Sequence, residues 1–223
     1  MMKTDPRPPD ARRPLRTRDT RWAAGLARTL LRTGLRPNGV SILSVVFAVA
    51  GGACLWLVSR GELPAIPLWL GAAVLIQLRL LCNLMDGMLA VEGGLRTPDG
   101  DLYNEFPDRL SDPLLLAALG YAGGDEASHL LGWLCACGAL LTAAVRLHGA
   151  TLTGTHDFRG PMAKPHRMAL ATAACLLMAA LAATGSEMRP LPWILGLMLA
   201  GIAVTLVRRL AGISRTLRAR PEP

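Results

Sequence analysis

Long apolar runs separated by short polar segments dominate the chain from about residue 40 onward. A helix needs roughly 20 mostly apolar residues to cross a bilayer. Six runs approach that length, at residues 40–58, 66–90, 108–123, 129–147, 168–185 and 191–207. The third run is impure because Asp108, Arg109 and Asp112 stand at its start. The pattern predicts an all-α integral membrane protein with six transmembrane helices, and it leaves five spans as the alternative.

The segment before the first run has a different pattern. Over residues 19–36, Trp22, Leu26 and Leu30 recur every four positions beside arginines, which is typical of an amphipathic helix lying in the membrane interface. The residues before it are rich in Pro, Arg and Asp and predict a disordered basic tail. The expected units are therefore the tail at 1–18, the interfacial helix at 19–36, a six-helix membrane domain at 37–210 and a basic cytoplasmic tail at 211–223.

Charge orients these helices and narrows the partners. The chain of 223 residues is 52% hydrophobic, yet it carries 24 Lys and Arg residues and a formal net charge of +8. With the N-terminus in the cytoplasm, only Arg60 and Arg189 lie in segments facing outward. We expect a multi-pass protein of the cytoplasmic membrane whose basic segments contact anionic membrane lipids. Aromatic residues are only 4% of the chain, which argues against nucleic acid as a partner.

The second apolar run ends in polar residues at membrane depth. Ionisable groups persist there mostly where they face a polar cavity or a partner, so they are site candidates. Asn83, Asp86 and Ala90 share one face of the predicted helix, with Gly87 next to Asp86. Arg79 lies one turn earlier. It is expected either to pair with a neighbouring helix or to contact substrate.

A second polar stripe follows across the predicted cytoplasmic loop. Asn104, Asp108 and Asp112 are spaced at i, i+4 and i+8, which places them on one face if the third helix begins a turn early. The two stripes can then oppose each other. Carboxylate and amide oxygens across a small gap suit a hard divalent cation such as Mg²⁺, which also accepts phosphate oxygens.

In these residues the chain resembles the CDP-alcohol phosphatidyltransferase family. The motif of that family reads D-x2-D-G-x2-A-R-x8-G-x3-D-x3-D across its second and third membrane helices. This chain keeps every spacing, as Asn83-x2-Asp86-Gly87-x2-Ala90-Val91-x8-Gly100-x3-Asn104-x3-Asp108. It departs from the motif where Asn83 and Asn104 replace aspartates and Val91 replaces the arginine. Two negative charges are lost, and Glu105 and Asp112 are candidates to compensate.

The resemblance implies roles for these residues. Asp108 would be the catalytic general base. A divalent cation, Mg²⁺ or Mn²⁺, would be held by Asp86, Asp108, Asn83 and Asn104. Substrate would be bound by Gly87, Ala90, Gly100, Arg109 and Asp112.

The resemblance also implies a reaction. We expect transfer of a phosphatidyl group from CDP-diacylglycerol, the CDP-linked lipid donor, to a small alcohol, with release of CMP. Four basic residues form a cytoplasmic cluster: Arg146, Arg159, Lys164 and Arg167. The cluster reflects either the usual excess of basic residues on the cytoplasmic side or an anion pocket for a phosphorylated acceptor such as glycerol 3-phosphate. Two alternatives stay open: a catalytically lost protein that binds nucleotide-lipid, and a transferase that joins a CDP-amino alcohol to diacylglycerol. A homodimer is also left open.

Overall fold

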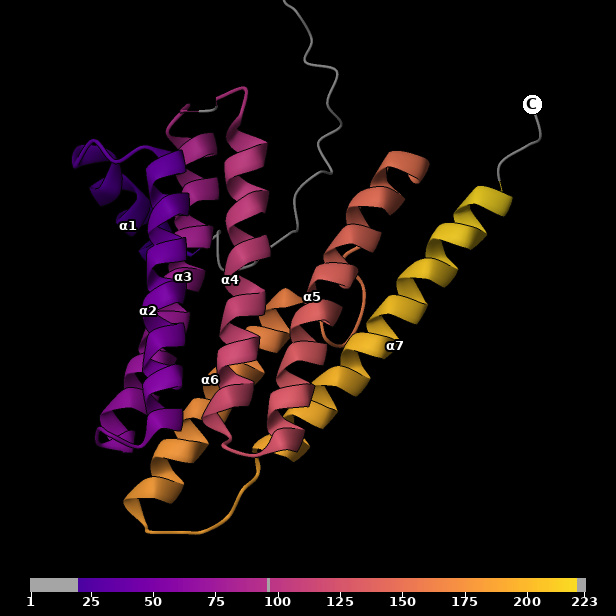
Figure 1. Ribbon diagram of the computed structural model, residues 1–223. Helices are drawn as coiled ribbons and strands as arrows, with labels where there is room; N and C mark the ends of the chain where they lie inside the picture. The colour runs from indigo at the N-terminus through magenta and orange to yellow at the C-terminus, as the bar shows by residue number, and fades with distance from the viewer. Residues whose placement is uncertain (1–19, 96, 220–223) are drawn as a thin grey trace, which may run out of the picture.

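The computed structural model describes residues 20–95 and 97–219, so the expected tail at 1–18 lies outside the described residues. All regular structure in the described part of the chain is helical, and Figure 1 shows the helices gathered into one bundle. They are α1 (Arg21–Arg32), α2 (Pro37–Arg60), α3 (Ala65–Glu92), α4 (Gly100–Ala122), α5 (Glu126–Thr153), α6 (Lys164–Ala183) and α7 (Leu191–Arg218). The predicted all-α fold is confirmed.

Five of the described helices are long and apolar enough to cross a membrane: α2, α3, α5, α6 and α7. The protein is therefore a multi-pass membrane protein, as the apolar runs predicted. α4 is not among the five, because charged residues such as Asp108 and Asp112 interrupt its apolar sequence. It nevertheless runs the length of the bundle beside α2 and α5 (Figure 1).

The helix ends follow from local sequence. Pro37 opens α2 in the first helical turn, where its missing N–H is not needed. Gly61 closes the same helix with a φ of 67°, a left-handed conformation that favours glycine. At the other end of the chain, α7 continues to Arg218, so part of the expected tail from residue 211 is helical. Ile213 explains the extension, since it packs beside Gly149 of α5.

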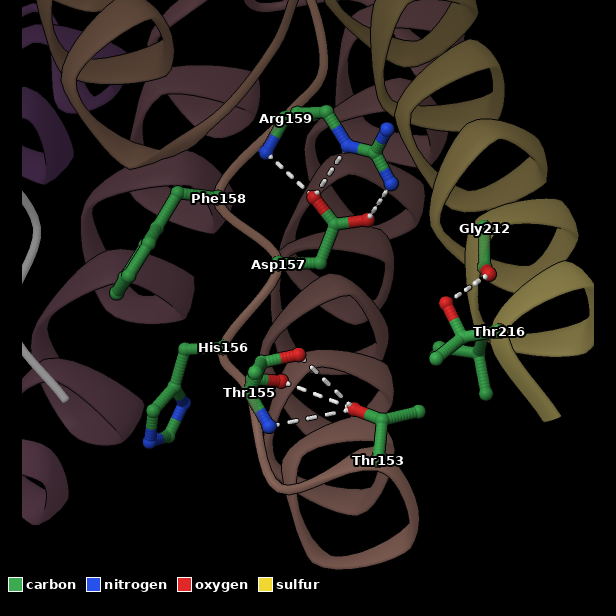
Figure 2. Close-up of a pocket in the computed structure, with 9 residues that line it drawn as sticks. Thr153, Thr155, His156, Asp157, Phe158, Arg159, Gly212 and Thr216 are labelled. Carbon is green, nitrogen blue, oxygen red and sulfur yellow. Dashed lines mark hydrogen bonds and ion pairs between the residues drawn. The ribbon is translucent and has the colours of Figure 1, made fainter. Parts of the chain in front are cut away.

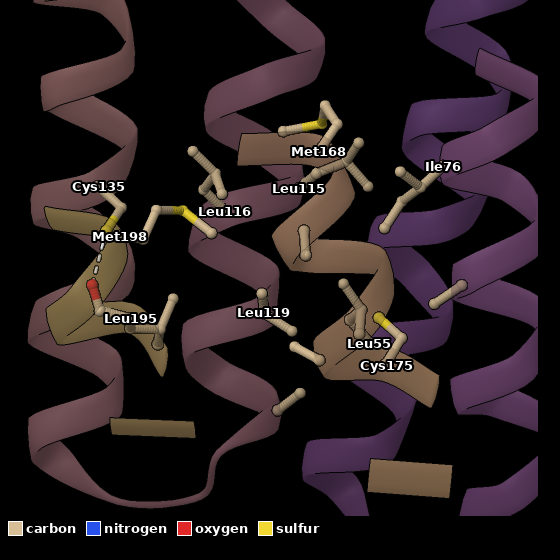
Figure 3. Packing of buried hydrophobic residues seen from close by; sticks show 14 of the residues in the cluster. Leu55, Ile76, Leu115, Leu116, Leu119, Cys135, Met168, Cys175, Leu195 and Met198 are labelled. Atoms are coloured by element: carbon tan, nitrogen blue, oxygen red, sulfur yellow. Dashed lines mark hydrogen bonds between the residues drawn. The ribbon is translucent and has the colours of Figure 1, made fainter. Parts of the chain in front are cut away.

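The core of the bundle is formed by buried side chains from all the long helices (Figure 3). Representative members are Leu55, Ile76, Leu116, Cys135, Met168 and Met198. Lipid tails are as apolar as leucine, so packing rather than water exclusion must hold such helices together. The α4–α5 crossing illustrates this, because a Cβ added to Gly132 would lie 2.7 Å from Cα of Gly120. The two backbones touch where glycines face each other.

α1 packs across one end of the bundle. Its buried residues Ala23 and Ala27 belong to a second apolar cluster that includes Met85 and Leu89 of α3. Trp22 is 53% exposed and lies outside this packed face, although the sequence pattern placed it with the apolar positions of the helix. In Figure 1, α1 lies at the same end as the α3–α4 connection. It therefore braces the part of α3 that carries the polar residues.

Candidate active site

Polar side chains from α2 and α3 meet near the end of the bundle where α1 packs. Ser41 of α2 donates a hydrogen bond from Oγ to Oδ2 of Asp86 on α3, at 2.8 Å. Asp86 is only 4% exposed. Its Oδ1 has no hydrogen-bond partner among the described residues. A buried polar atom left without a partner is costly, so this oxygen marks a place where a ligand can bind.

Asp108 of α4 lies against α3 and the start of α6. Its Oδ1 accepts hydrogen bonds from Nδ2 of Asn83, at 2.8 Å, and from Nη2 of Arg79, at 2.7 Å. Its Oδ2 accepts a hydrogen bond from Nζ of Lys164. The first and last positions of the motif, Asn83 and Asp108, are thus in direct contact. Both carboxylate oxygens of Asp108 are engaged by donors.

A line of alternating charges extends from Asp108 into the bundle. Arg79 is fully buried, and its Nη2 also lies 2.6 Å from Oδ1 of Asp112, as an ion pair rather than a hydrogen bond. Oδ2 of Asp112 is 3.2 Å from Nη2 of Arg167, which also donates from Nη1 to Thr142. Removing one partner from a buried ion pair typically costs about 3–5 kcal/mol, because it leaves the other charge uncompensated. This network therefore constrains the packing of α3, α4 and α6.

The remaining motif residues lie nearby with different exposure. Gly87 and Ala90 are partly buried on α3, and Gly100 begins α4. A Cβ on Gly100 would meet only Thr97 Oγ1, at 3.4 Å, which leaves open space beside it. Asn104 is exposed on α4, one turn before Asp108. The structure thus brings Asn83 and Asp108 together, whereas it leaves Asn104 facing outward.

Glu105 joins a second group of charges and does not face Asp86. Both of its carboxylate oxygens accept hydrogen bonds from Arg146 Nη2, at 2.6 and 2.8 Å. Arg109, one helical turn further along α4, also donates to Glu105. Arg146 lies over the ring of Phe158, 5.4 Å from its centroid. Glu105 and Asp112, the two candidates to replace lost negative charge, are therefore both paired with arginines.

Two contacts of the site were not foreseen from the sequence. Ser41 stands at the start of an ordinary apolar helix, and nothing in its neighbourhood signals that it reaches Asp86. Lys164 was grouped with the basic cluster, but its partner Asp108 is 56 positions away. One weak signal for this site is present in the sequence, because an arginine within an apolar run, Arg79, needs an anionic partner inside the bundle.

The described residues offer limited ligands for a divalent cation. Among residues 20–95 and 97–219, no three His, Cys, Asp or Glu side chains are grouped so that they could hold a metal ion. Asp86 supplies one buried carboxylate oxygen without a partner, and Asn83 supplies an amide oxygen nearby on the same helix face. Mg²⁺ is often bound by one or two protein carboxylates while substrate phosphates complete its shell. The residues fit a cation of that kind.

A pocket of about 510 Å³ opens apart from the motif residues, between the end of α5, the α5–α6 loop and α7 (Figure 2). Its lining includes Thr153, His156, Asp157, Arg159 and Thr216. Asp157 accepts hydrogen bonds from the backbone N–H and the guanidinium of Arg159. Burial alone would raise the pKa of Asp157, but these bonds outweigh it and hold the pKa below its usual value. The carboxylate is therefore ionised and restrains Arg159 at the rim.

Comparison with known proteins finds relatives among the phosphatidylinositol phosphate synthases and one bifunctional enzyme. No family model matches the chain. Phosphatidylinositol phosphate synthase of Mycolicibacterium smegmatis is 27% identical over 200 residues, covering 88% of this chain and 83% of that protein. A bifunctional IPC transferase and DIPP synthase of Rubrobacter xylanophilus is 33% identical over 117 residues, covering 52% of this chain. The chain spans only 25% of the length of that second relative.

Solved structures with the same fold come from phosphatidylinositol phosphate synthase of Mycobacterium tuberculosis. The form with CDP-DAG bound matches with a TM-score of 0.69 at 23% identity, covering 87% of this chain and 94% of that one. The form in complex with manganese and citrate matches with a TM-score of 0.68, also at 23% identity, covering 89% and 90%. The fold is shared over nearly the whole described chain.

The chain shares its fold with solved phosphatidylinositol phosphate synthases, and its motif spacing resembles that of the CDP-alcohol phosphatidyltransferase family. The resemblance that the sequence predicted is confirmed, and the relatives that it matches in sequence are enzymes of this class. The manganese complex of a structural neighbour agrees with the predicted divalent cation cofactor.

Proposed function

We propose that the protein transfers a phosphatidyl group from CDP-diacylglycerol to a small alcohol and releases CMP. The observation that carries this proposal is the contact between Asn83 and Asp108 across α3 and α4, beside the unpartnered buried oxygen of Asp86. It brings the two halves of the motif together at one end of a membrane bundle. The CDP-DAG complex of a structural neighbour supports the choice of donor.

The residues divide the chemistry between them. Asp86 and the amide oxygen of Asn83 would hold the divalent cation, Mg²⁺ or Mn²⁺, which supplies positive charge to the diphosphate of the donor. Asp108 accepts the proton of the acceptor hydroxyl. The acceptor oxygen then forms a bond to the phosphorus that carries the diacylglycerol, and the bond from that phosphorus to the CMP oxygen breaks. Gly87 and Gly100 leave space for the nucleotide.

Asp108 can act as a base only after its ion pair with Lys164 opens. In the structure the ammonium group of Lys164 occupies Oδ2, the oxygen that Arg79 and Asn83 leave free. An anionic substrate entering between α4 and α6 would offer Lys164 a competing partner. Lys164 is therefore positioned to bind a substrate phosphate and, by moving, to expose Asp108.

A phosphorylated polyol fits as the acceptor. Arg159, Arg208 and Arg215 line a recess of about 380 Å³ beside the larger pocket, and this concentration of positive charge suits a phosphate monoester. The name of the relatives, phosphatidylinositol phosphate synthase, supports an inositol phosphate over glycerol 3-phosphate. Both acceptors belong in the test.

The test uses purified protein with CDP-diacylglycerol labelled in the cytidine. CMP release from this donor is measured with inositol phosphate, glycerol 3-phosphate and inositol as separate arms. A further arm uses a CDP-amino alcohol labelled in its own cytidine as donor and diacylglycerol as acceptor. Asp108→Asn should reduce turnover by about 10²-fold or more, as expected for loss of a general base. Glu187→Gln, at an exposed residue in the α6–α7 connection, is the matched control. Full activity of the Asp108→Asn variant would contradict the proposed base.

A binding protein without catalysis is the second candidate. It is favoured by one observation, the engagement of both oxygens of Asp108 by Arg79, Asn83 and Lys164. On this alternative, wild-type protein retains CDP-diacylglycerol but releases no CMP with any acceptor. The assay above separates the two.

We also propose that α4 is a sixth span and that α1 lies in the interface of the cytoplasmic membrane. α4 carries its charges toward Arg79 and Arg167 inside the bundle, which compensates them at membrane depth. The loop after α3, the loop after α5 and both ends of the chain would then face the cytoplasm. Exposed apolar side chains such as Leu130 and Val207 are left to contact lipid or a second copy in a homodimer.

A further inference from the structure

The charges of the site are balanced without any added ion. Three buried or partly buried carboxylates stand beside three basic side chains, Asp86, Asp108 and Asp112 with Arg79, Lys164 and Arg167. Asp108 forms ion pairs with Arg79 and Lys164. Asp112 forms ion pairs with Arg79 and Arg167. Asp86 accepts its hydrogen bond from the neutral Ser41 hydroxyl, and among the described residues no ion pair joins it to a basic side chain. The negative charge available to an outside cation is therefore concentrated at Asp86.

Arg79 has the position of a bridging cation. It is fully buried, and a single nitrogen, Nη2, lies 2.7 Å from Asp108 and 2.6 Å from Asp112. These carboxylates are one turn apart on α4, so without a cation between them they would repel each other in a low-dielectric interior. Nε and Nη1 of the same guanidinium have no partners among the described residues. One internal charge thus neutralises a carboxylate pair.

Asn83 is matched to Arg79. The two residues are one turn apart on α3, and both donate to the same oxygen of Asp108. An ionised aspartate at position 83 could not donate to Asp108 and would add a third negative charge to the pair. The amide instead completes the shell of Asp108. Arg79 and Asn83 together account for how this chain keeps the motif spacing with fewer anions.

We propose that Arg79 is a built-in cation that replaces a divalent ion at Asp108, so that the site binds one divalent ion, at Asp86, and Asp108 is not a metal ligand. This rests on the proposed function for the identity of the site, but not on turnover. Both oxygens of Asp108 are already engaged, whereas Oδ1 of Asp86 is buried and unpartnered among the described residues. Asp86 is the carboxylate left to bind an ion.

Counting bound Mn²⁺ tests this directly. Full-length protein in nanodiscs with CDP-diacylglycerol is titrated with Mn²⁺, and the free ion is followed by its electron paramagnetic resonance signal. We expect one bound Mn²⁺ per chain. Asp86→Asn should abolish it, and Asp108→Asn should leave one ion bound with a Kd changed less than about 3-fold. Two ions on wild type, no ion on wild type, or loss of the ion in Asp108→Asn but not in Asp86→Asn overturns the proposal.

A reciprocal variant exchanges the internal cation for an external one. Arg79→Met combined with Asn83→Asp removes the guanidinium and restores a carboxylate, so it should bind a second Mn²⁺ and gain thermal stability when the ion is added. Arg79→Lys keeps the charge and should stay at one ion. Arg189→Met, in the α6–α7 connection, is the control. A folded double variant that still binds only one ion would refute the role of Arg79.

If the double variant does not fold, the Asp86→Asn and Asp108→Asn counts still decide the question. Failure of the proposed function is a separate result, since absence of CMP release in wild type leaves the Mn²⁺ count unchanged.

Discussion

Asn83 donates a hydrogen bond from Nδ2 to Oδ1 of Asp108 across the α3–α4 interface, at 2.8 Å. An aspartate in place of Asn83 would set two acceptors against each other at that distance. The Asn83 amide donates to Asp108, so α3 and α4 approach each other here through a hydrogen bond. The contact links the divergence of the sequence to the geometry of the site.

Asn83→Asp should destabilise the protein in the absence of divalent ions. It exchanges a donated hydrogen bond for repulsion between partly buried carboxylates, at a cost of about 1–3 kcal/mol. The measurement is the thermal unfolding midpoint in detergent, with and without Mn²⁺. Added Mn²⁺ should restore part of the lowered midpoint of the variant. Asn104→Asp makes the same chemical change at an exposed position of α4 and should have little effect on the midpoint. Equal shifts of the midpoint in both variants would show that the Asn83–Asp108 hydrogen bond does not contribute to stability.

Ser41→Ala should impair both stability and function. The variant removes the hydrogen bond from Ser41 to Oδ2 of Asp86, while Oδ1 already has no partner among the described residues. Leaving a buried polar group unsatisfied costs about 1–3 kcal/mol. We expect a lower unfolding midpoint and slower CMP release, with both effects reduced at high Mn²⁺ concentration. Ser44→Ala is the matched control, because that buried hydroxyl donates to the backbone oxygen of Ser41 in its own helix. Wild-type behaviour of Ser41→Ala would argue against the orientation of Asp86 by Ser41.

Gly120→Ala should disrupt the crossing of α4 and α5. The added Cβ would lie 2.6 Å from the backbone oxygen of Ser128 and 2.8 Å from Cα of Gly132, so the helices must separate. We expect a loss of more than about 1–3 kcal/mol, the usual cost of overpacking, because the clash is with backbone that cannot rotate away. Unfolding is followed by the midpoint in detergent. Gly196→Ala, where a Cβ meets nothing within 4 Å, should be neutral. A stable Gly120→Ala protein would mean that the helices do not cross so closely.

Thr97→Cys should resist labelling from outside intact cells. Thr97 lies in the α3–α4 connection, which the distribution of basic residues assigns to the cytoplasm. The experiment replaces the five native cysteines and applies a membrane-impermeant maleimide before and after lysis. Ser186→Cys in the α6–α7 connection should be labelled in intact cells. Reversal of the two patterns would place the motif on the outer side.

The sequence supplied the elements because their causes are local. Runs of about 20 apolar residues require helices in lipid, where every backbone polar group must be satisfied within the segment. The limits predicted for the second helix, 66–90, therefore lie close to the observed Ala65–Glu92. The i, i+4 spacing of Asn104 and Asp108 likewise put them on one helix, since helical geometry alone decides which side chains share a face. The family motif then indicated which residues of the two helices belong to one site.

Residue patterns along the chain thus predicted an all-helical membrane protein with the motif of a CDP-alcohol phosphatidyltransferase across two of its helices. Which charges pair with one another follows from how the helices pack in three dimensions. Lys164 and Asp108, and likewise Arg167 and Asp112, are distant in the chain and meet only because α6 packs against α3 and α4. Burial of Arg79 between two carboxylates depends on the same packing. A residue pattern records which groups are charged, whereas electrostatic pairing depends on distance in space, and that distance is set only when the helices are assembled.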